Sequence, residues 1–204
     1  NAVIISETWQ KDTTLLRMLR GDRADTTMNY RLRDAVIGFL TPGAFDSKGF
    51  ADSGRSILPS EFSARLQSIQ EDYPAAAFYS AMNLLDSHDT GRLRSLLGEN
   101  DALQRLAALV QFTFPGVPGL YYGDEIGMGD NVYLGDRYGM RTPMQWNLNP
   151  NAGFSTANPQ RLYLPLITDP VYRHESVNVA AQESSHASLL WWIRNVVAMR
   201  KRIA

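Results

Sequence analysis

A polar cluster follows an apolar run near the middle of the chain. Residues 79–92 read YSAMNLLDSHDTGR, so Asp86, His88 and Asp89 arrive together directly after mostly apolar residues. A short apolar run of this kind is typical of a strand buried on both faces. At the carboxyl end of a parallel strand, two carboxylates and an imidazole can divide acid, base and electrostatic roles among them. The cluster therefore predicts a reaction site at a strand end.

A further carboxylate lies near the start of the chain. Residues 3–9 read VIISETW, in which Glu7 follows a β-branched run and Trp9 stands two residues further on. An indole at this place would supply an apolar wall and a ring face on which a sugar can stack. If the strands are parallel neighbours, Glu7 and Asp89 project into one cleft. A protonated acid at a leaving oxygen, with anionic groups near a developing oxocarbenium ion, is the arrangement that glycoside cleavage needs.

Each of these residues also has an ordinary structural explanation. A glutamate after a strand, such as Glu7, is commonly a solvated loop residue or a helix cap. His88, flanked by acids, could equally be a hydrogen-bonded structural histidine. Asp86 is better explained as a residue that caps the loop turn. Spacing alone leaves these readings open.

The elements that must position these residues alternate between strand-like and helix-like periods. Strands are predicted at 2–6, 25–30, 80–85 and 119–123. Helices are predicted at 12–20, 31–40, 60–73, 100–114 and from 188 onward. Strands alternating with helices indicate βαβ units and a parallel sheet. Four strand–helix pairs are half of a (β/α)₈ TIM barrel, so the predicted fold is α/β, the C-terminal half (strands 5–8) of such a barrel, with long loops at 41–59 and 124–185.

Composition excludes several other classes of protein. The 204 residues carry 20 Lys+Arg against 21 Asp+Glu, which leaves no electrostatic signature for binding nucleic acid or an anionic membrane. The longest apolar runs are too short to span a bilayer. The chain has no cysteine, so disulfides and thiol metal sites are excluded. Because the chain opens without a methionine and ends within a helical pattern, we expect both ends to be cut, and localisation, cytoplasmic or secreted, stays open.

Three motifs, in order along the chain, resemble the α-amylase superfamily, glycoside hydrolase family 13. VIISETW, MNLLDSHDT and GVPGLYYGDEIGM are similar to its fifth-, seventh- and eighth-strand regions. DTTMNYRLRDAVIGFL and YSAMNLLDSHDT resemble the neopullulanase, cyclomaltodextrinase and maltogenic-amylase branch, whereas YGDEIGMGDN, RTPMQWN and SVNVAAQ resemble the trehalose synthase and α-glucosidase branch. The resemblance covers nearly the whole chain and implies that residues 1–204 are one partial catalytic barrel.

The resemblance implies a role for each matching residue. Glu7 corresponds to the general acid/base of the family. Asp89 corresponds to the carboxylate that holds the sugar hydroxyls and stabilises the transition state, and His88 to the histidine that binds the same sugar. Trp9 would line the leaving-group side of the cleft.

Two arginines and the nucleophile require separate comment. Arg92 and Arg137 are further candidates for sugar contacts, although an exposed arginine is more often a solvated surface charge. The family's nucleophile is an aspartate that ends the fourth strand, two residues after an arginine. Arg23 and Asp25 have that separation, but no apolar strand precedes them, so we interpret them as a loop. The 204-residue chain alone is therefore expected to be inactive.

The expected parent protein is a retaining α-glucan-acting glycoside hydrolase of the α-amylase/neopullulanase type, with α-glucan or maltooligosaccharide substrates joined by α-1,4 and in some cases α-1,6 bonds. The alternatives are an α-glucosyltransferase or isomerase such as trehalose synthase, and a non-catalytic sugar-binding or scaffold remnant. We expect the open strand edges to be covered by the missing N-terminal barrel half or by self-association. No cofactor or metal is expected, and the calcium sites known in parts of the family cannot be placed, because no EF-hand-like spacing is present.

Overall fold

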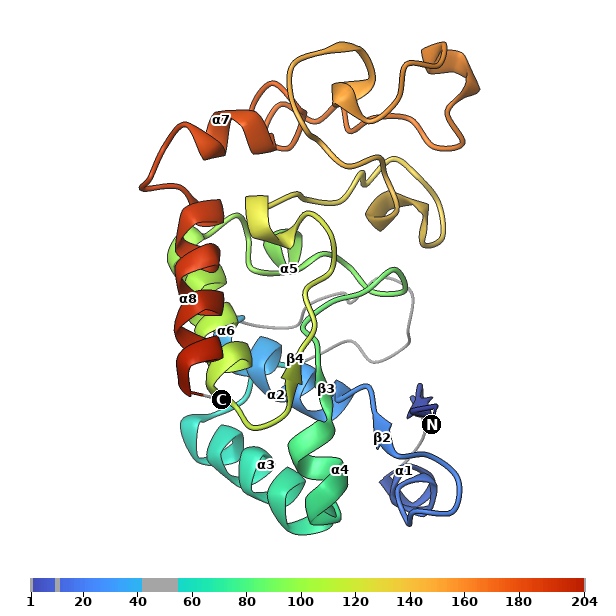
Figure 1. Cartoon of the computed structure of the whole chain (residues 1–204), viewed down its shortest axis with the longest axis vertical. Helices are drawn as coiled ribbons and strands as arrows, with labels where there is room; N and C mark the ends of the chain where they lie inside the picture. Colours follow the sequence, from blue (N-terminus) through green and yellow to red (C-terminus); the bar gives the residue numbers. More distant parts are fainter. Residues whose placement is uncertain (1, 10–11, 42–54, 204) are drawn as a thin grey trace.

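The computed structural model describes residues 2–9, 12–41 and 55–203. In Figure 1, β3 and β4 lie near the centre and β2 lies toward the right, with α6 and α8 to the left of the strands and α3 and α4 below them. The described strands are β1 (Ile5–Ser6), β2 (Thr26–Thr27), β3 (Met82–Asn83) and β4 (Val117–Pro118). The described α-helices are α1 (Asp12–Met18), α2 (Tyr30–Leu40), α3 (Pro59–Asp72), α4 (Ala75–Ser80), α5 (Leu93–Leu96), α6 (Asp101–Thr113), α7 (Val179–Glu183) and α8 (Leu189–Ile203). Single 3₁₀ turns are η1 (Asp124–Ile126), η2 (Tyr138–Met140), η3 (Pro150–Gly153) and η4 (Pro159–Arg161).

The strands run parallel, as the alternation of elements predicts. β1 pairs with β2, and β3 pairs with β4, both in parallel register. A parallel bridge between Met28 and Met82 connects the two pairs. The order in space is therefore β1, β2, β3, β4, and all their carboxyl ends lie at one edge. This parallel arrangement is confirmed, and it is what brings the polar residues after each strand to one side of the molecule.

Buried amide side chains reinforce strands that are only two residues long. Asn29 Nδ2 donates to Asn83 Oδ1 at 2.9 Å, which links the end of β2 to β3. Asn83 Nδ2 donates to the carbonyl of Pro115, just before β4. Gln111, on α6, donates from Nε2 to the carbonyls of Asn83 and Gly119. These bonds tie three strands and a helix together where the backbone ladder is short.

The positions of two strands differ from the sequence predictions. The predicted strand 119–123 is wrong, because β4 lies at Val117–Pro118 and Tyr121–Asp124 form a turn that requires Gly123 at φ 92°. The predicted strand 80–85 begins later, since Ser80 ends the helix α4. The alanine-rich run that opens α4 favours a helix, and the short strand follows it.

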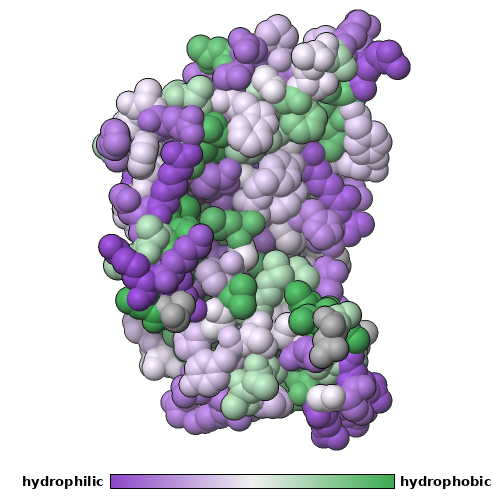
Figure 2. Space-filling view, in the orientation of Figure 1, coloured by the Kyte–Doolittle hydropathy of each residue, from purple (hydrophilic) through white to green (hydrophobic). Residues whose placement is uncertain are grey.

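The first strand also differs, in its burial. The run 2–6 was expected to be a buried strand, but Val3, Ile4 and Ile5 are 71%, 57% and 50% exposed. Among the described strands β1 pairs with β2 alone, so one side of β1 has no neighbour. Figure 2 shows apolar surface toward the lower right, where the N-terminal segment lies in Figure 1. Such an apolar edge is normally covered by another chain segment or a partner.

The long loop from 124 to 185 forms a layer above the carboxyl ends of β3 and β4 (Figure 1). It is ordered by a small apolar cluster, in which Ile126, Met128, Met144, Ile167 and Tyr172 of the loop pack with Leu190 of α8. Of the predicted loop 41–59, residues 42–54 lie outside the described residues. None of the helices in the described ranges is long and apolar enough to cross a membrane.

Candidate active site

Glu7 and Asp89 both lie at the carboxyl edge of the parallel strands. Glu7 directly follows β1, and Asp89 stands on the turn after β3. Tyr30, the first residue of α2, lies close to both, and it is 6% exposed. Burial raises the pKa of the Tyr30 phenol above its usual range, and the carboxylates of Glu7 and Asp89 raise it further. The charges of both carboxylates thus act on one buried phenol, and both residues follow strands at the carboxyl edge.

Trp9 packs directly on the same tyrosine. The ring centroids of Trp9 and Tyr30 are 3.5 Å apart, with the planes tilted by 31°. Trp9 is partly exposed, so one part of its indole contacts the core of the site and another part remains accessible. The structure thus brings Trp9 to the edge where Glu7 lies.

Asp89 is held by two arginines on a single oxygen atom. Arg137 and Arg141 each donate to Asp89 Oδ1 at 2.7 Å, and the Asp89 side chain is 10% exposed. The backbone N–H of Asp89 donates to Ser87 Oγ at 3.1 Å, which closes the turn. Because both guanidinium groups use Oδ1, the other carboxylate oxygen is left to face His88.

His88 lies beside that second oxygen. His88 Nε2 is 3.5 Å from Asp89 Oδ2, and the imidazole side chain is 55% exposed. Arg141 Nε donates to the backbone carbonyl of His88 at 2.8 Å, so the arginine fixes the backbone and leaves the ring free to reach a ligand. The imidazole and one carboxylate oxygen can together accept and donate hydrogen bonds to adjacent hydroxyl groups.

Arg92 does not lie where a sugar contact is expected. It is fully buried, and its guanidinium donates to the backbone carbonyls of Tyr122 at 2.7 Å and Met140 at 3.0 Å. Its backbone N–H donates to both carboxylate oxygens of Asp130. Arg92 therefore holds the loop after β4 in place, and the expectation of a sugar contact is corrected to a structural role.

Arg141 is the site residue that sequence reasoning missed. It lies in RTPMQWN, which contributed to the family resemblance without any role for its arginine. The contact that reveals it joins residues 52 positions apart in the sequence. A possible signal was the spacing of Arg137 and Arg141, because arginines four residues apart around a short helical turn can reach one carboxylate.

The Arg23–Asp25 pair lies at the opposite edge of the strands. Asp25 directly precedes β2, and its Oδ2 accepts a hydrogen bond from the backbone N–H of Ile4 at 2.8 Å. Asp25 is exposed at the amino ends of the strands, whereas Glu7 lies at the carboxyl ends. The interpretation of this pair as a loop agrees with that placement.

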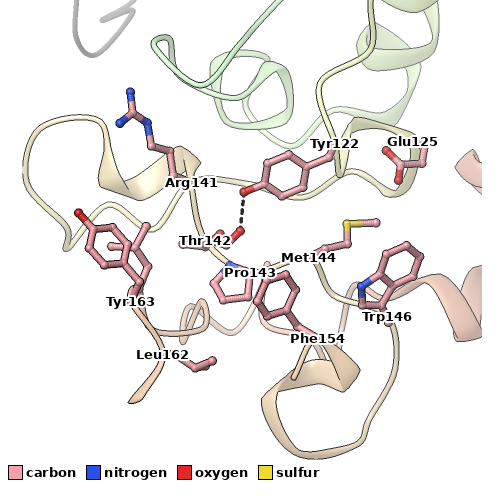
Figure 3. Close-up of a pocket in the computed structure, with 11 residues that line it drawn as sticks. Tyr122, Glu125, Arg141, Thr142, Pro143, Met144, Trp146, Phe154, Leu162 and Tyr163 are labelled. Atoms are coloured by element: carbon pink, nitrogen blue, oxygen red, sulfur yellow. Dashed lines mark hydrogen bonds between the residues drawn. The ribbon is translucent and has the colours of Figure 1, made fainter. Parts of the chain in front are cut away.

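Arg137 and Arg141 together form an arginine clamp on Asp89, and a cavity of about 540 Å³ adjoins it (Figure 3). Arg141 lines it while its guanidinium points away toward Asp89, and Tyr122 Oη donates to the Thr142 carbonyl at 2.6 Å. The remaining wall is mostly aromatic and apolar: Glu125, Pro143, Met144, Trp146, Phe154, Leu162, Tyr163 and Leu164. Aromatic faces of this kind can stack on the apolar faces of pyranose rings.

Within residues 2–9, 12–41 and 55–203, no group of three or more histidine, aspartate or glutamate side chains is arranged to hold a metal ion. The groups that line this edge are carboxylates, an imidazole, guanidinium groups and aromatic rings. Carboxylates at such an edge are suited to acid–base and electrostatic roles.

Comparison with known proteins identifies the class to which this site belongs. The family model for the α-amylase catalytic domain matches residues 1–204, so the chain belongs to the α-amylase family of glycoside hydrolases. The trehalose synthase/amylase TreS of Mycolicibacterium smegmatis is 57% identical over 112 residues, which cover 54% of this chain and 19% of that protein. Neopullulanase 2 of Thermoactinomyces vulgaris is 40% identical over 128 residues, which cover 63% of this chain and 19% of that protein.

Solved structures agree with this assignment. The crystal structure of the α-amylase from H. orenii superposes with a TM-score of 0.73 and 25% identity, covering 98% of this chain and 36% of that one. The structural neighbours are α-amylase barrel enzymes, which is consistent with a partial (β/α)₈ fold. The chain thus spans about a third of this solved relative, and the matched regions are less than a fifth of the curated ones.

Proposed function

We propose that this chain forms strands five to eight of the catalytic barrel of a retaining α-glucan-acting glycoside hydrolase. The observation that carries the proposal is the placement of Glu7 after β1 and of Asp89 after β3, at the carboxyl edge of parallel strands. Membership of the α-amylase family and similarity to a neopullulanase support the same reaction class. The substrate is accordingly an α-glucan or a maltooligosaccharide.

The proposed roles follow from the contacts of each side chain. Glu7 protonates the leaving oxygen and then removes a proton from the incoming water or sugar. Asp89, held by Arg137 and Arg141 through Oδ1, directs its second oxygen and the neighbouring His88 to the hydroxyls of the bound ring. Hydrogen bonds to these hydroxyls strengthen as positive charge builds on the ring, which lowers the barrier.

A retaining mechanism also needs a nucleophilic carboxylate about 5 Å from the acid. Asp25 lies at the opposite edge, so it does not fit that role. We propose that a chain segment outside residues 1–204 supplies the nucleophile, and that the chain by itself does not turn over substrate. The same segment would cover the exposed Val3, Ile4 and Ile5 of the open β1 edge.

A separate experiment tests whether another chain segment covers the open β1 edge. Without the other half, the isolated 204-residue chain is expected to dimerise or aggregate through its apolar edge. Size-exclusion chromatography combined with light scattering measures the molar mass of the isolated chain. A stable monomer over a wide range of concentrations would contradict this part of the proposal.

A second candidate is α-glucosyl transfer or isomerisation. It is favoured by the similarity to a trehalose synthase/amylase and by the long loop 124–185 over the carboxyl edge. Both reactions use the same acid/base and differ in whether water reaches the glucosyl intermediate. Incubating the full-length protein with maltose and quantifying glucose and trehalose separates the two. A third possibility, a non-catalytic sugar-binding remnant, predicts neither product.

The proposal is tested most simply at Glu7. In the full-length protein, Glu7→Gln is expected to reduce kcat on maltotriose by about 10²–10⁴-fold, the usual contribution of a general acid/base. Binding of maltotriose, measured by calorimetry, should persist because the amide keeps the shape of the carboxyl. Glu71→Gln, at an exposed glutamate of α3, is the matched control and should leave kcat unchanged. Full activity of Glu7→Gln would show that another carboxyl is the acid.

A further inference from the structure

Two buried carboxyl groups lie at the strand ends next to the turn that carries Asp89. Asp86 follows β3, and Asp124 begins η1 after β4. Because β3 and β4 run parallel, both carboxyl groups stand at the same edge of the strands. They are 2% and 6% exposed, and neither has a part in the mechanism proposed above. Burying two carboxylates together is costly unless the protein compensates their charge.

The hydrogen bonds of this pair leave two oxygens unsatisfied. Asp86 Oδ2 accepts from the backbone N–H of Leu93 at 2.7 Å, and Asp124 Oδ2 accepts from that of Tyr121 at 3.3 Å. Among the described residues, no donor reaches Oδ1 of either aspartate, although both atoms are buried. A proton placed between the two carboxyl groups would satisfy both oxygens, because it is bound to one and donated to the other.

The charges around the pair lead to the same arrangement. Burial raises the pKa of Asp124 well above its ordinary value of 3.8, the charge of Asp86 and a hydrogen bond to it raise this pKa further, and Glu125 adds to the effect. The guanidinium of Arg92 opposes the shift, and burial also raises the pKa of the neighbouring Asp130. A single guanidinium therefore faces more than one buried carboxyl group, and a proton held between Asp86 and Asp124 reduces the excess negative charge.

We propose that Asp86 and Asp124 share one proton at neutral pH and that this carboxyl pair positions the turn carrying His88 and Asp89. Neither member of the pair contacts the sugar in the proposed mechanism, so both are positioning residues. The shared proton stands independently of the proposed function, whereas its effect on catalysis rests on that function.

The connection to the turn runs through Asp86. This residue precedes Ser87 and also binds the N–H of Leu93, so it joins the two ends of the segment that contains Asp89. Within the segment, Ser87 N–H donates to Thr90 Oγ1 at 2.9 Å, and Asp89 N–H donates to Ser87 Oγ. When the pair loses its proton at high pH, two adjacent buried carboxylates repel each other, and the segment loosens.

The presence of the proton is tested by infrared spectroscopy of the full-length protein at neutral pH. The wild type is expected to show the C=O stretch of a protonated, buried carboxyl group, and Asp124→Asn and Asp86→Asn are each expected to lack it. Asp22→Asn, at an exposed aspartate, is the matched control and should keep the band. A wild-type spectrum without this band, or one in which both pair variants retain it, overturns the shared proton.

The positioning role is tested by hydrogen exchange at the backbone amides of Asp89 and Leu93 as the pH is raised. In the wild type their protection should fall about tenfold beyond the intrinsic pH effect, as expected when each amide loses one hydrogen bond. In Asp124→Asn the new side-chain amide at position 124 can donate to Asp86 without an added proton. The protection of both backbone amides should therefore persist at high pH. If the wild type and this variant lose protection in parallel, the pair does not position the turn.

Neither measurement requires enzyme activity, so a failure of the glycosidase proposal leaves both informative. If the proposed function also holds, the alkaline limb of kcat/KM should move to higher pH in Asp124→Asn, with kcat near neutral pH close to the wild type. If Asp124→Asn is active and its alkaline limb is unchanged, the Asp86–Asp124 pair does not influence catalysis.

Discussion

The two-arginine clamp on Asp89 gives a quantitative prediction for stability. Arg137 and Arg141 each donate to Oδ1 at 2.7 Å, and their side chains are 35% and 32% exposed. A hydrogen bond to a charged group contributes about 1.5–3 kcal/mol when well shielded. Partial exposure screens these bonds, so we expect Arg137→Gln or Arg141→Gln alone to cost about 1 kcal/mol, since the other arginine still neutralises the carboxylate.

Replacing both arginines should lower the free energy of unfolding by more than the sum of the two single replacements. The Asp89 side chain is 10% exposed, and without either guanidinium it becomes a buried carboxylate beside a partly exposed His88. Breaking a buried charge pair so completely costs about 3–5 kcal/mol. The double variant should therefore exceed the sum of the single losses, about 2 kcal/mol, by roughly 1–3 kcal/mol.

The assay is urea unfolding of the four full-length proteins at neutral pH, analysed as a double-mutant cycle. Repeating the cycle in an Asp89→Asn background provides the control, because the neutral amide removes the charge that couples the arginines. We expect the coupling to disappear there. Losses that add within about 0.5 kcal/mol in the wild-type background would show that the two arginines act independently and do not share one carboxylate.

Three further predictions concern other parts of the chain. Ala152 has φ 56°, in the left-handed region, so Ala152→Gly should stabilise the protein by about 0.5–1 kcal/mol in urea unfolding, whereas Ala157→Gly should not; a loss in Ala152→Gly would contradict the assigned strain. Burial raises the pKa of Tyr73 from 10.0 to about 12, so the stability from its neutral phenol is complete below pH 10 and falls as the pH rises to 12. Ultraviolet titration of tyrosinate should show one late-ionising group in the wild type that is absent from Tyr73→Phe. Asn83→Ala should lower the free energy of unfolding by about 2–4 kcal/mol, because it leaves the buried Asn29 amide without its partner; a change within 0.5 kcal/mol, as is usual for surface sites, would argue against that network.

Local patterns in the sequence were sufficient for most helices. Within the predicted helix 12–20, Leu15 and Leu19 are 4% and 3% exposed, and Leu16 between them is half-buried. Ile69 of the predicted helix 60–73 is fully buried. These positions could be predicted because apolar spacing depends on the residue's own element. The parallel order of the strands followed from the same alternation.

Long-range contacts account for the parts that were not predicted. The clamp of Arg141 on Asp89 and the burial of Arg92 both depend on how the loop after β4 folds back over the β3 end. No local pattern distinguishes an arginine that binds backbone carbonyls from one that faces solvent. The displacement of β4 to Val117–Pro118 likewise reflects the left-handed Gly123 and the pairing with β3, which a run of apolar letters does not reveal.

In the proposed mechanism, Glu7 and Asp89 act on one sugar ring. The most direct measurement is a crystal structure of the full-length Glu7→Gln protein with maltotriose. We predict a glucose ring whose hydroxyls are hydrogen-bonded to Asp89 and His88, with its glycosidic oxygen within hydrogen-bonding distance of residue 7. A sugar bound elsewhere, with Asp89 and His88 free of it, would contradict the account.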